Sequence, residues 1–412
     1  MSSSLIFNAL LIIISLMMVF LLSRPKVRNN DTWQATLTPL SSIIGSGFLV
    51  MAPLLASVVG ILSPVAVLAI VILAYAIGNV MRFNILHVEP RSNDGTLSRG
   101  TREVEYLGNI ALGLAYMVAV AFYLSLLSSF LLNYLGYSNI TLERWLTTVI
   151  ILVIAVIGYL KGLNGLEKLE SLSMTIQLSI VVALLVGLSV FGINFLQSNE
   201  ELTFNYQKRE ISTQIQILAG ALLVVQGFET SRFIGEKYSA EVRVSSMRNA
   251  QLLSGALYIV SVILFMPIVQ KIDLMHVELS QIINVTGLVA ITLPLMLIIA
   301  ALMSQFSAAV ADTGGAGGLF NENSNKRLST NISYVGVSIC AILLVWAVDL
   351  LEIITLASRA FATYYFLQTL LALFYCYNDC DINSRMSLVS RILYMALAAV
   401  LAYVILFAIP AE

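Results

Sequence analysis

The number and length of its apolar runs constrain this chain more than any other feature. An α-helix needs ~20 predominantly apolar residues to cross a bilayer, and twelve segments approach or exceed that length. They lie at about residues 4–23, 36–59, 61–86, 104–135, 141–160, 166–195, 212–236, 246–270, 284–320, 331–348, 351–377 and 387–409. Because 59% of the residues are hydrophobic and only 11% are charged, a soluble core would leave much apolar surface in water. The sequence therefore predicts an all-α polytopic membrane protein with about twelve transmembrane helices.

The distribution of lysine and arginine predicts how these helices are oriented. Loops that stay in the cytoplasm are enriched in both residues, and one set of alternate loops, beginning with residues 24–28, holds most of them. The helix at 36–59 therefore begins in the cytoplasm, and both chain ends lie outside. The first apolar run lacks a basic start and a small-residue cleavage site, so we expect an anchor and not a cleaved signal peptide. We expect this arrangement in a plasma membrane such as the bacterial inner membrane.

Cysteine and histidine usage argues against several kinds of chemistry. The three thiols are Cys340, Cys376 and Cys380, and both histidines, His87 and His276, fall in predicted loops. No metal cluster, Ser-His-Asp set or phosphate-binding glycine loop with its lysine can be drawn from the sequence. We therefore expect no enzyme and reduced, structurally idle thiols. The net charge of -1, without a basic patch, predicts no nucleic acid partner.

Two of the predicted helices are interrupted near their centres. The run at 36–59 contains Gly45-Ser46-Gly47, and the run at 212–236 reaches Gln226-Gly227 before Phe228 and Glu229. In lipid, backbone groups freed from a helix must find other partners, and a bound ligand is one such partner. Close packing of another helix against the glycines is the alternative for either break alone. The second break lies five segments after the first, as in transporters built from inverted repeats.

The strings "SSIIGSGFLVMAP" and "VVQGFETSRFIGEK" resemble the first and sixth core helices of the amino acid–polyamine–organocation superfamily. This resemblance implies a LeuT-type fold of two inverted five-helix repeats with discontinuous first and sixth core helices. The repeats then span 34–196 and 197–377, and residues 1–33 and 378–412 add one transmembrane helix each. The implied function is secondary active transport of a small organic solute, an amino acid in the first instance, by alternating access.

The resemblance also implies a substrate site at the two breaks. Amide groups of Gly45, Ser46 and Gly47 would bind a substrate carboxylate, and carbonyl groups of Gln226 and Gly227 would bind its amine. Phe228 would cover the substrate, and Tyr116, with Phe122 and Tyr123, would line the pocket. Each has a structural alternative, because Ser46 can bond its own helix and the aromatic residues can serve in ordinary packing.

The coupling ion has two candidate sites. The resemblance places a sodium ion between the carbonyl groups of Ser41 and Ile44 and the hydroxyl groups of Ser304 and Ser307. Ala308 stands where a further hydroxyl is expected, so this ligand set is incomplete. No other cofactor is expected.

Ionisable residues within the spans provide the alternative, proton coupling. Burial favours the neutral form of Asp312, although it is also placed to cap a helix that unwinds at "TGGAGG". Glu229 is a candidate for substrate binding and for charge coupling, and a local ion pair with Arg232, one turn later, is its structural alternative. Arg359 either pairs with Glu352 or lines the outer vestibule.

The substrate is the least determined part of this prediction. After the eighth core helix the chain reads "DTGGAGGLFNENSNKR", which departs from the Arg-containing acidic stretch of amino acid permeases in the family. An amine or a nucleobase-like solute fits the same architecture. A membrane sensor or assembly subunit that has lost transport is the alternative from another class, and a channel is disfavoured because no continuous polar lining is visible. The sequence does not indicate an oligomeric state.

Overall fold

The computed structural model describes residues 2–45, 47–137, 139–198, 200–275, 279–324, 327–348, 350–379 and 388–409. Every regular element within these ranges is helical. Eight helical segments of the described chain are long and apolar enough to cross a membrane, and two of them, 31–93 and 140–197, each contain two predicted spans. The two remaining predicted runs form the interrupted sixth core helix and helix α14. The described residues thus account for the predicted set of spans.

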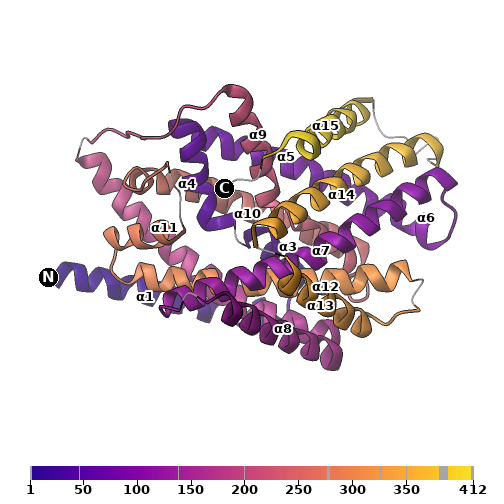
Figure 1. Cartoon of the computed structure of the whole chain (residues 1–412), viewed down its shortest axis with the longest axis horizontal. Helices are drawn as coiled ribbons and strands as arrows, with labels where there is room; N and C mark the ends of the chain where they lie inside the picture. The colour runs from indigo at the N-terminus through magenta and orange to yellow at the C-terminus, as the bar shows by residue number, and fades with distance from the viewer. Residues whose placement is uncertain are drawn as a thin grey trace.

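The helices follow one another along the chain, and a longer connection leads from α8 to α9 (Figure 1). Before the second break they are α1 (Ser2–Leu22), α2 (Pro25–Arg28), α3 (Asp31–Ile44), α4 (Gly47–Val59), η1 (Gly60–Leu62), α5 (Ser63–Phe83), η2 (Asn84–Val88), α6 (Glu89–Asn93), α7 (Arg99–Tyr134), α8 (Ile140–Gln197), α9 (Ile211–Ala221) and η3 (Leu222–Val225). After it come η4 (Phe228–Phe233), α10 (Ala240–Val269), α11 (Leu279–Val285), η5 (Thr286–Leu288), α12 (Leu293–Asn323), α13 (Thr330–Ala347), α14 (Leu350–Asn378) and α15 (Leu388–Phe407).

The first core helix is interrupted where the glycines predict it. Helix α3 is capped by Asn30, whose side chain accepts a hydrogen bond from the amide of Trp33 at 2.9 Å. It ends at Gly45, whose amide makes the last helical bond, to the carbonyl oxygen of Ser41 at 3.2 Å. Helix α4 starts again at Gly47. Ser46 itself lies outside the described residues.

The sixth core helix is interrupted in the same way. Helix α9 tightens into the single turn η3, and the short turn η4 begins after Gly227. The φ angle of Gly227 is 114°, a backbone conformation that residues with a side chain rarely adopt. The change of direction between η3 and η4 is therefore built around a glycine.

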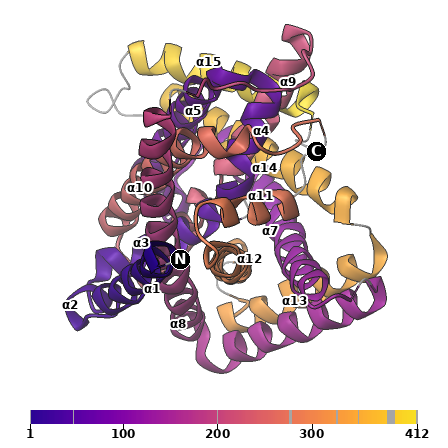
Figure 2. The ribbon, with the colours of Figure 1, turned by 90° about the vertical axis from the view of Figure 1, so that its left-hand side faces the viewer.

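The core helices form two groups that meet at the breaks. In the first group α10 packs against α3, α4, α5 and η4. In the second group α12 packs against α7, α8 and α13, and α13 packs against α8 (Figures 1 and 2). Contacts of α12 with α3 and η4 join the two groups. Both discontinuous helices therefore belong to one group and face the central helix of the other.

Helix α8 contains the fourth and fifth core helices as one helical stretch with a kink. The kink is at Gly162, where φ is 60° and ψ is -155°. Two helices lie outside the ten-helix core: α1 packs against α8, and α15 packs against α14 (Figure 1). These are the additional N-terminal and C-terminal helices that the apolar runs predict.

The structure corrects four expectations of the sequence analysis. The run at 284–320 is not one helix, because α11 and η5 precede α12, whose first turn is set by Pro294. The segment "TGGAGG" does not unwind, since α12 continues to Asn323. His87 lies in the helical turn η2 and not in a loop. Glu229 does not pair with Arg232, as described below. His276 and Cys380 lie outside the described residues.

Candidate functional site

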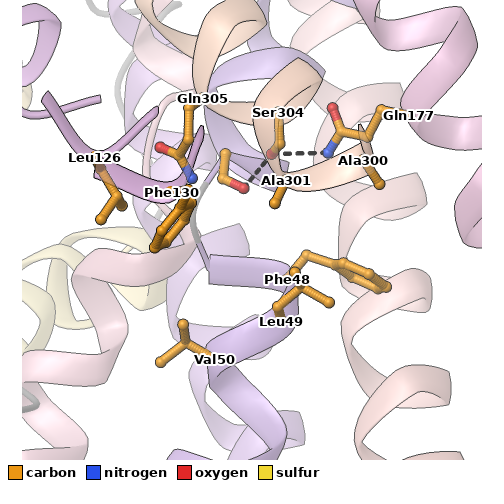
Figure 3. Close-up of a pocket in the computed structure, with 11 residues that line it drawn as sticks. Phe48, Leu49, Val50, Leu126, Phe130, Gln177, Ala300, Ala301, Ser304 and Gln305 are labelled. Carbon is orange, nitrogen blue, oxygen red and sulfur yellow. Dashed lines mark hydrogen bonds between the residues drawn. The ribbon is translucent and has the colours of Figure 1, made fainter. Parts of the chain in front are cut away.

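The break in the first core helix lies against the middle of α12. The hydroxyl of Ser304 donates a hydrogen bond to the carbonyl oxygen of Gly45 and accepts one from Nε2 of Gln177 at 2.9 Å (Figure 3). Ser304 is 4% exposed and Gln177 is 1% exposed. A backbone carbonyl freed by the break is thus satisfied by a side chain of another helix, as a non-polar surrounding requires.

A cavity of about 30 Å³ lies beside this junction. Phe48, Leu49 and Val50 of α4 line it on one side in Figure 3, and Gln305 and Gln177 lie on opposite sides of Ser304. The side-chain oxygens of both glutamines have no hydrogen-bond partner within the described part of the chain. A space of this size holds about one water-sized group. An amino acid would enter only if the surrounding helices moved apart.

Asp312 of α12 lies at the junction between the two breaks. Its Oδ1 accepts a hydrogen bond from the hydroxyl of Ser42 at 2.7 Å. The same hydroxyl would lie 2.4 Å from a Cβ atom built on Gly227. Ser42 of α3 therefore contacts both the carboxyl of α12 and the glycine of the second break. Asp312 is fully buried and mid-helix, so it does not act as a helix cap.

Glu229 is held by neutral groups. Its Oε2 accepts hydrogen bonds from the amide of Gly227 at 3.0 Å and from the hydroxyl of Tyr365. The ring of Phe228 stacks on the ring of Tyr365, with centroids 5.1 Å apart. The predicted covering aromatic thus packs on α14 in this conformation. Glu229, Phe228 and Tyr365 are each at most 2% exposed.

Several buried polar atoms near the breaks, Oε1 of Gln226 among them, have no hydrogen-bond partner among the described residues. Three others are Oε1 of Glu229, Oδ2 of Asp312 and the hydroxyl of Tyr116. All three side chains are fully buried, and the Tyr116 hydroxyl interacts electrostatically with the carboxyl groups of Glu229 and Asp312. It would also be 3.0 Å from a Cβ atom on Gly315, so it faces the backbone of α12. Buried groups without partners are costly, and such a cluster is typical of a ligand or proton site.

The predicted sodium ligands are engaged in other interactions. The carbonyl oxygen of Ser41 accepts a hydrogen bond from the amide of Gly45 at 3.2 Å, and the hydroxyl of Ser304 donates to the carbonyl oxygen of Gly45. The hydroxyl of Ser307 lies 3.7 Å from the sulfur of Met174 and donates to the carbonyl oxygen of Ser304 at 3.1 Å. Ile44 is buried at the end of α3. A sodium ion prefers several converging oxygen atoms, and a thioether is a poor ligand for it. The Ser304 and Ser307 hydroxyls act as donors in these bonds, which leaves oxygen lone pairs for a cation. The sodium site therefore stays a prediction.

Glu170 is a site residue that the sequence analysis did not identify. It lies in the second half of α8, is 2% exposed and accepts hydrogen bonds from Ser41 at 3.0 Å and Thr38 at 3.1 Å. The signal was present, because Glu170 stands near the start of the apolar run at 166–195, in "EKLESLSMT". A carboxyl at the edge of a run is common, however, and only the fold places this one against α3.

Arg232 pairs with a different helix from the one expected. Its guanidinium lies 2.6 Å from Oε1 of Glu105 on α7 and donates to Oε1 of Gln368 on α14 at 2.9 Å. Arg359 is exposed in the first half of α14. The side chain of Glu352, its suggested partner, lies outside the described residues. Arg359 therefore does not join the central cluster.

One family model and one relative match this chain over most of its length. A family model described as APC superfamily transporter matches residues 25–408. An uncharacterized protein of Aquifex aeolicus (strain VF5) is 39% identical over 361 residues, which make up 87% of this chain and 87% of that protein.

Solved structures are similar in fold over nearly the whole chain. MhsT in complex with L-phenylalanine matches with a TM-score of 0.61 at 12% identity, covering 91% of this chain and 98% of that chain. A Na+-coupled sialic acid symporter in a substrate-bound outward-open state matches with a TM-score of 0.54 at 12% identity, covering 98% and 97%. At such identities these two structures indicate the fold and not the substrate.

Proposed function

Because the chain belongs to the APC superfamily of transporters and has a LeuT-type fold, we propose that it moves an amino acid across the membrane by secondary active transport. The two groups of helices would rock against each other and open the junction of the breaks alternately to each side. The family and its fold point away from an enzyme. The substrate, the coupling ion and the residues that bind them are the parts that we propose.

The cluster around Glu229 and Asp312 supports an ammonium group on the substrate. Both carboxyls are fully buried, and their described partners are hydroxyl and amide groups without positive charge. A buried carboxylate is strongly favoured by a charge-assisted hydrogen bond to a cation. The partner-less oxygens of Glu229 and Asp312 therefore suit the ammonium group of an amino acid, and the Tyr116 hydroxyl suits one of its oxygens. This is the observation on which the proposal chiefly rests.

The helix ends at the breaks support a carboxylate group at the opposite end of the substrate. Gly45 and Gly47 flank a point where amide groups leave the helical ladder, and such groups bind carboxylates. In this conformation a Cβ atom on Gly47 would lie 2.1 Å from Val224 and 2.6 Å from the Tyr258 hydroxyl. The half-helices are therefore packed together, and binding would require the rocking motion that we propose.

Protons are the coupling ion that the arrangement favours. Asp312 and Glu170 each accept hydrogen bonds from hydroxyls of α3, through Ser42 and through Ser41 with Thr38. A buried carboxyl that gains or loses a proton can change such contacts between helices. A sodium-coupled transporter remains an outcome of the test below.

Two measurements test this proposal. Thermal unfolding of the purified protein with a panel of amino acids, amines and nucleobases should show stabilisation by one class of ligand, because a bound ligand stabilises by mass action. Uptake of that ligand into proteoliposomes should then follow an inward proton gradient and should not require sodium. Strict dependence on sodium would overturn proton coupling, and stabilisation by nucleobases alone would overturn the amino acid.

Substitutions connect these measurements to the cluster. Asp312→Asn and Glu229→Gln should each lower ligand affinity at least about tenfold, because a charged partner of the ammonium group is lost. Glu241→Gln removes an exposed carboxyl at the start of α10 and is the matched control, with unchanged binding expected. Binding that is insensitive to both central substitutions would refute the ammonium site.

A further inference from the structure

A second, larger cavity of about 950 Å³ lies away from the breaks, between the additional helix α1 and the core. One wall is formed by the end of α1 and by the start of α3. The facing wall is the second half of α8, and Lys237 and Tyr238, which follow η4, complete it. Figure 1 shows α1 lying alongside α8. The cavity is thus bounded laterally by two helices that are long and apolar enough to span the membrane.

The lining changes from basic to apolar along the direction of both helices. On α8 Lys168 is followed toward the middle of the span by Leu172 and Ile176, one turn at a time, with the uncharged Ser171 and Thr175 beside them. On the facing side Val19 and Leu22 of α1 precede Arg28. Because the loop at 24–28 is predicted to be cytoplasmic, the basic end of the cavity lies at the cytoplasmic membrane surface and the apolar end lies within the bilayer.

The basic end carries an excess of positive charge. Arg28, Lys168 and Lys237 line it together with two acidic residues, Asp31 and Glu167. Glu167 pairs with Lys237. Arg28 and Lys168 are exposed and form no ion pair with the described residues. Asp31 lies in the first turn of α3, where a negative charge is favoured by the amide groups of the helix end. Two cations are therefore available to a ligand.

From this geometry we propose that the cavity binds an anionic phospholipid. The phosphate group would contact Arg28 and Lys168, and the acyl chains would lie along Leu22, Leu172 and Ile176. Basic pockets between transmembrane helices on the cytoplasmic side have the charge to bind such headgroups. A free phosphate would use only the basic end, whereas the lining continues toward the bilayer with uncharged side chains, Leu22, Leu172 and Ile176 among them. The bound lipid would join α1 and α3 to α8, which gives the additional helix a role in holding the first half of the broken helix.

The experiment measures lipid binding and thermal unfolding of the full chain in detergent. Phosphatidylglycerol should bind and raise the unfolding temperature, and phosphatidylcholine should do so much less. In Arg28→Gln with Lys168→Gln the apparent affinity for phosphatidylglycerol should fall about 10- to 30-fold, since each basic residue near a headgroup contributes a comparable factor. Arg99→Gln with Arg248→Gln is the matched control, because both residues are exposed and predicted cytoplasmic but lie outside the cavity.

Several outcomes would overturn the proposal. Equal stabilisation by phosphatidylcholine would show that charge plays no part, and an equal loss in the control variant would show a general surface effect. Full stabilisation by glycerol phosphate alone would identify a site for a soluble anion. Arg28→Lys with Lys168→Arg keeps both charges and should retain binding, which separates loss of the site from a folding defect. None of these readouts depends on the transported substrate.

Discussion

Gly227 shows how a single residue sets the geometry of the site. Its φ of 114° allows η4 to leave the direction of η3, and its missing side chain allows Ser42 to approach. A Cβ atom would lie 2.4 Å from the Ser42 hydroxyl and 2.7 Å from the Ser42 backbone carbon. Ser42 can therefore contact Gly227 and donate to Asp312 at once. The glycine serves both the turn and the close approach of the two broken helices.

Gly227→Ala should consequently lower both stability and ligand binding. The left-handed backbone alone costs about 1–3 kcal/mol for a residue with a side chain, and the clash with the Ser42 backbone adds to this. Gly136→Ala is the control, because Gly136 also has a positive φ, of 81°, but nothing lies within 4 Å of its Cβ position. Thermal unfolding measures both variants. Equal losses would show that only backbone strain matters and that the approach of Ser42 does not.

At the scale of elements, buried ion pairs join the two groups of helices at their predicted cytoplasmic ends. Arg232 of η4 pairs with Glu105 of α7, with both side chains at most 8% exposed. Arg243 of α10 lies 2.5 Å from Glu89 of α6 and also donates to the carbonyl oxygen of Arg232. The sixth core helix is therefore tied both to its own group and to the facing group. We infer that these contacts hold the predicted cytoplasmic side closed in this conformation.

Glu105→Gln should release that closure. Removing one partner of a buried pair leaves an uncompensated charge, which destabilises the closed conformation by about 3–5 kcal/mol. Hydrogen exchange of the amides at 228–236 should accelerate, and the unfolding temperature should fall. Glu103→Gln tests the neighbouring exposed pair, in which Arg99 is 93% and Glu103 is 63% exposed, and should cost at most about 0.5 kcal/mol. Unchanged exchange at 228–236 in Glu105→Gln would show that the pair does not hold the closed side.

At the scale of the whole molecule, the order of helices implies one orientation in the membrane. If the first core helix begins in the cytoplasm, the side of the membrane on which every later connection lies is fixed. The charge distribution predicts that the connection at Asp94 is cytoplasmic and that the chain after α15 is outside. The cytoplasmic placement of the lipid cavity and of the ion pairs depends on this orientation.

Reporter fusions test the orientation directly. Alkaline phosphatase, which is active only outside the cytoplasm, should be active when fused after α15 and inactive when inserted at Asp94. A fluorescent protein that folds in the cytoplasm should show the opposite pattern and provides the control for expression. Phosphatase activity at Asp94 would reverse the orientation, and the proposed lipid site would then face the outer surface.

Local patterns in the sequence were sufficient for the spans and for the two breaks. Run length and glycine placement are properties of neighbouring residues, so the all-α fold and the discontinuous first and sixth core helices were predicted and are confirmed. The errors arose where a local pattern had two physical solutions. Glycines in "TGGAGG" disfavour a helix in isolation, yet packing keeps α12 intact, with Tyr116, Tyr334 and Phe233 close to Gly315, Gly317 and Gly318.

The contacts that make up the candidate site required the tertiary structure. Ser42 and Asp312 are 270 residues apart, Ser41 and Glu170 are 129 apart, and Arg232 and Glu105 are 127 apart. No periodicity or motif connects such pairs, because the partner of a buried polar group is set by which helices pack together. The sequence thus determined that the chain spans the membrane with two broken helices, while packing determined which carboxyl each break faces.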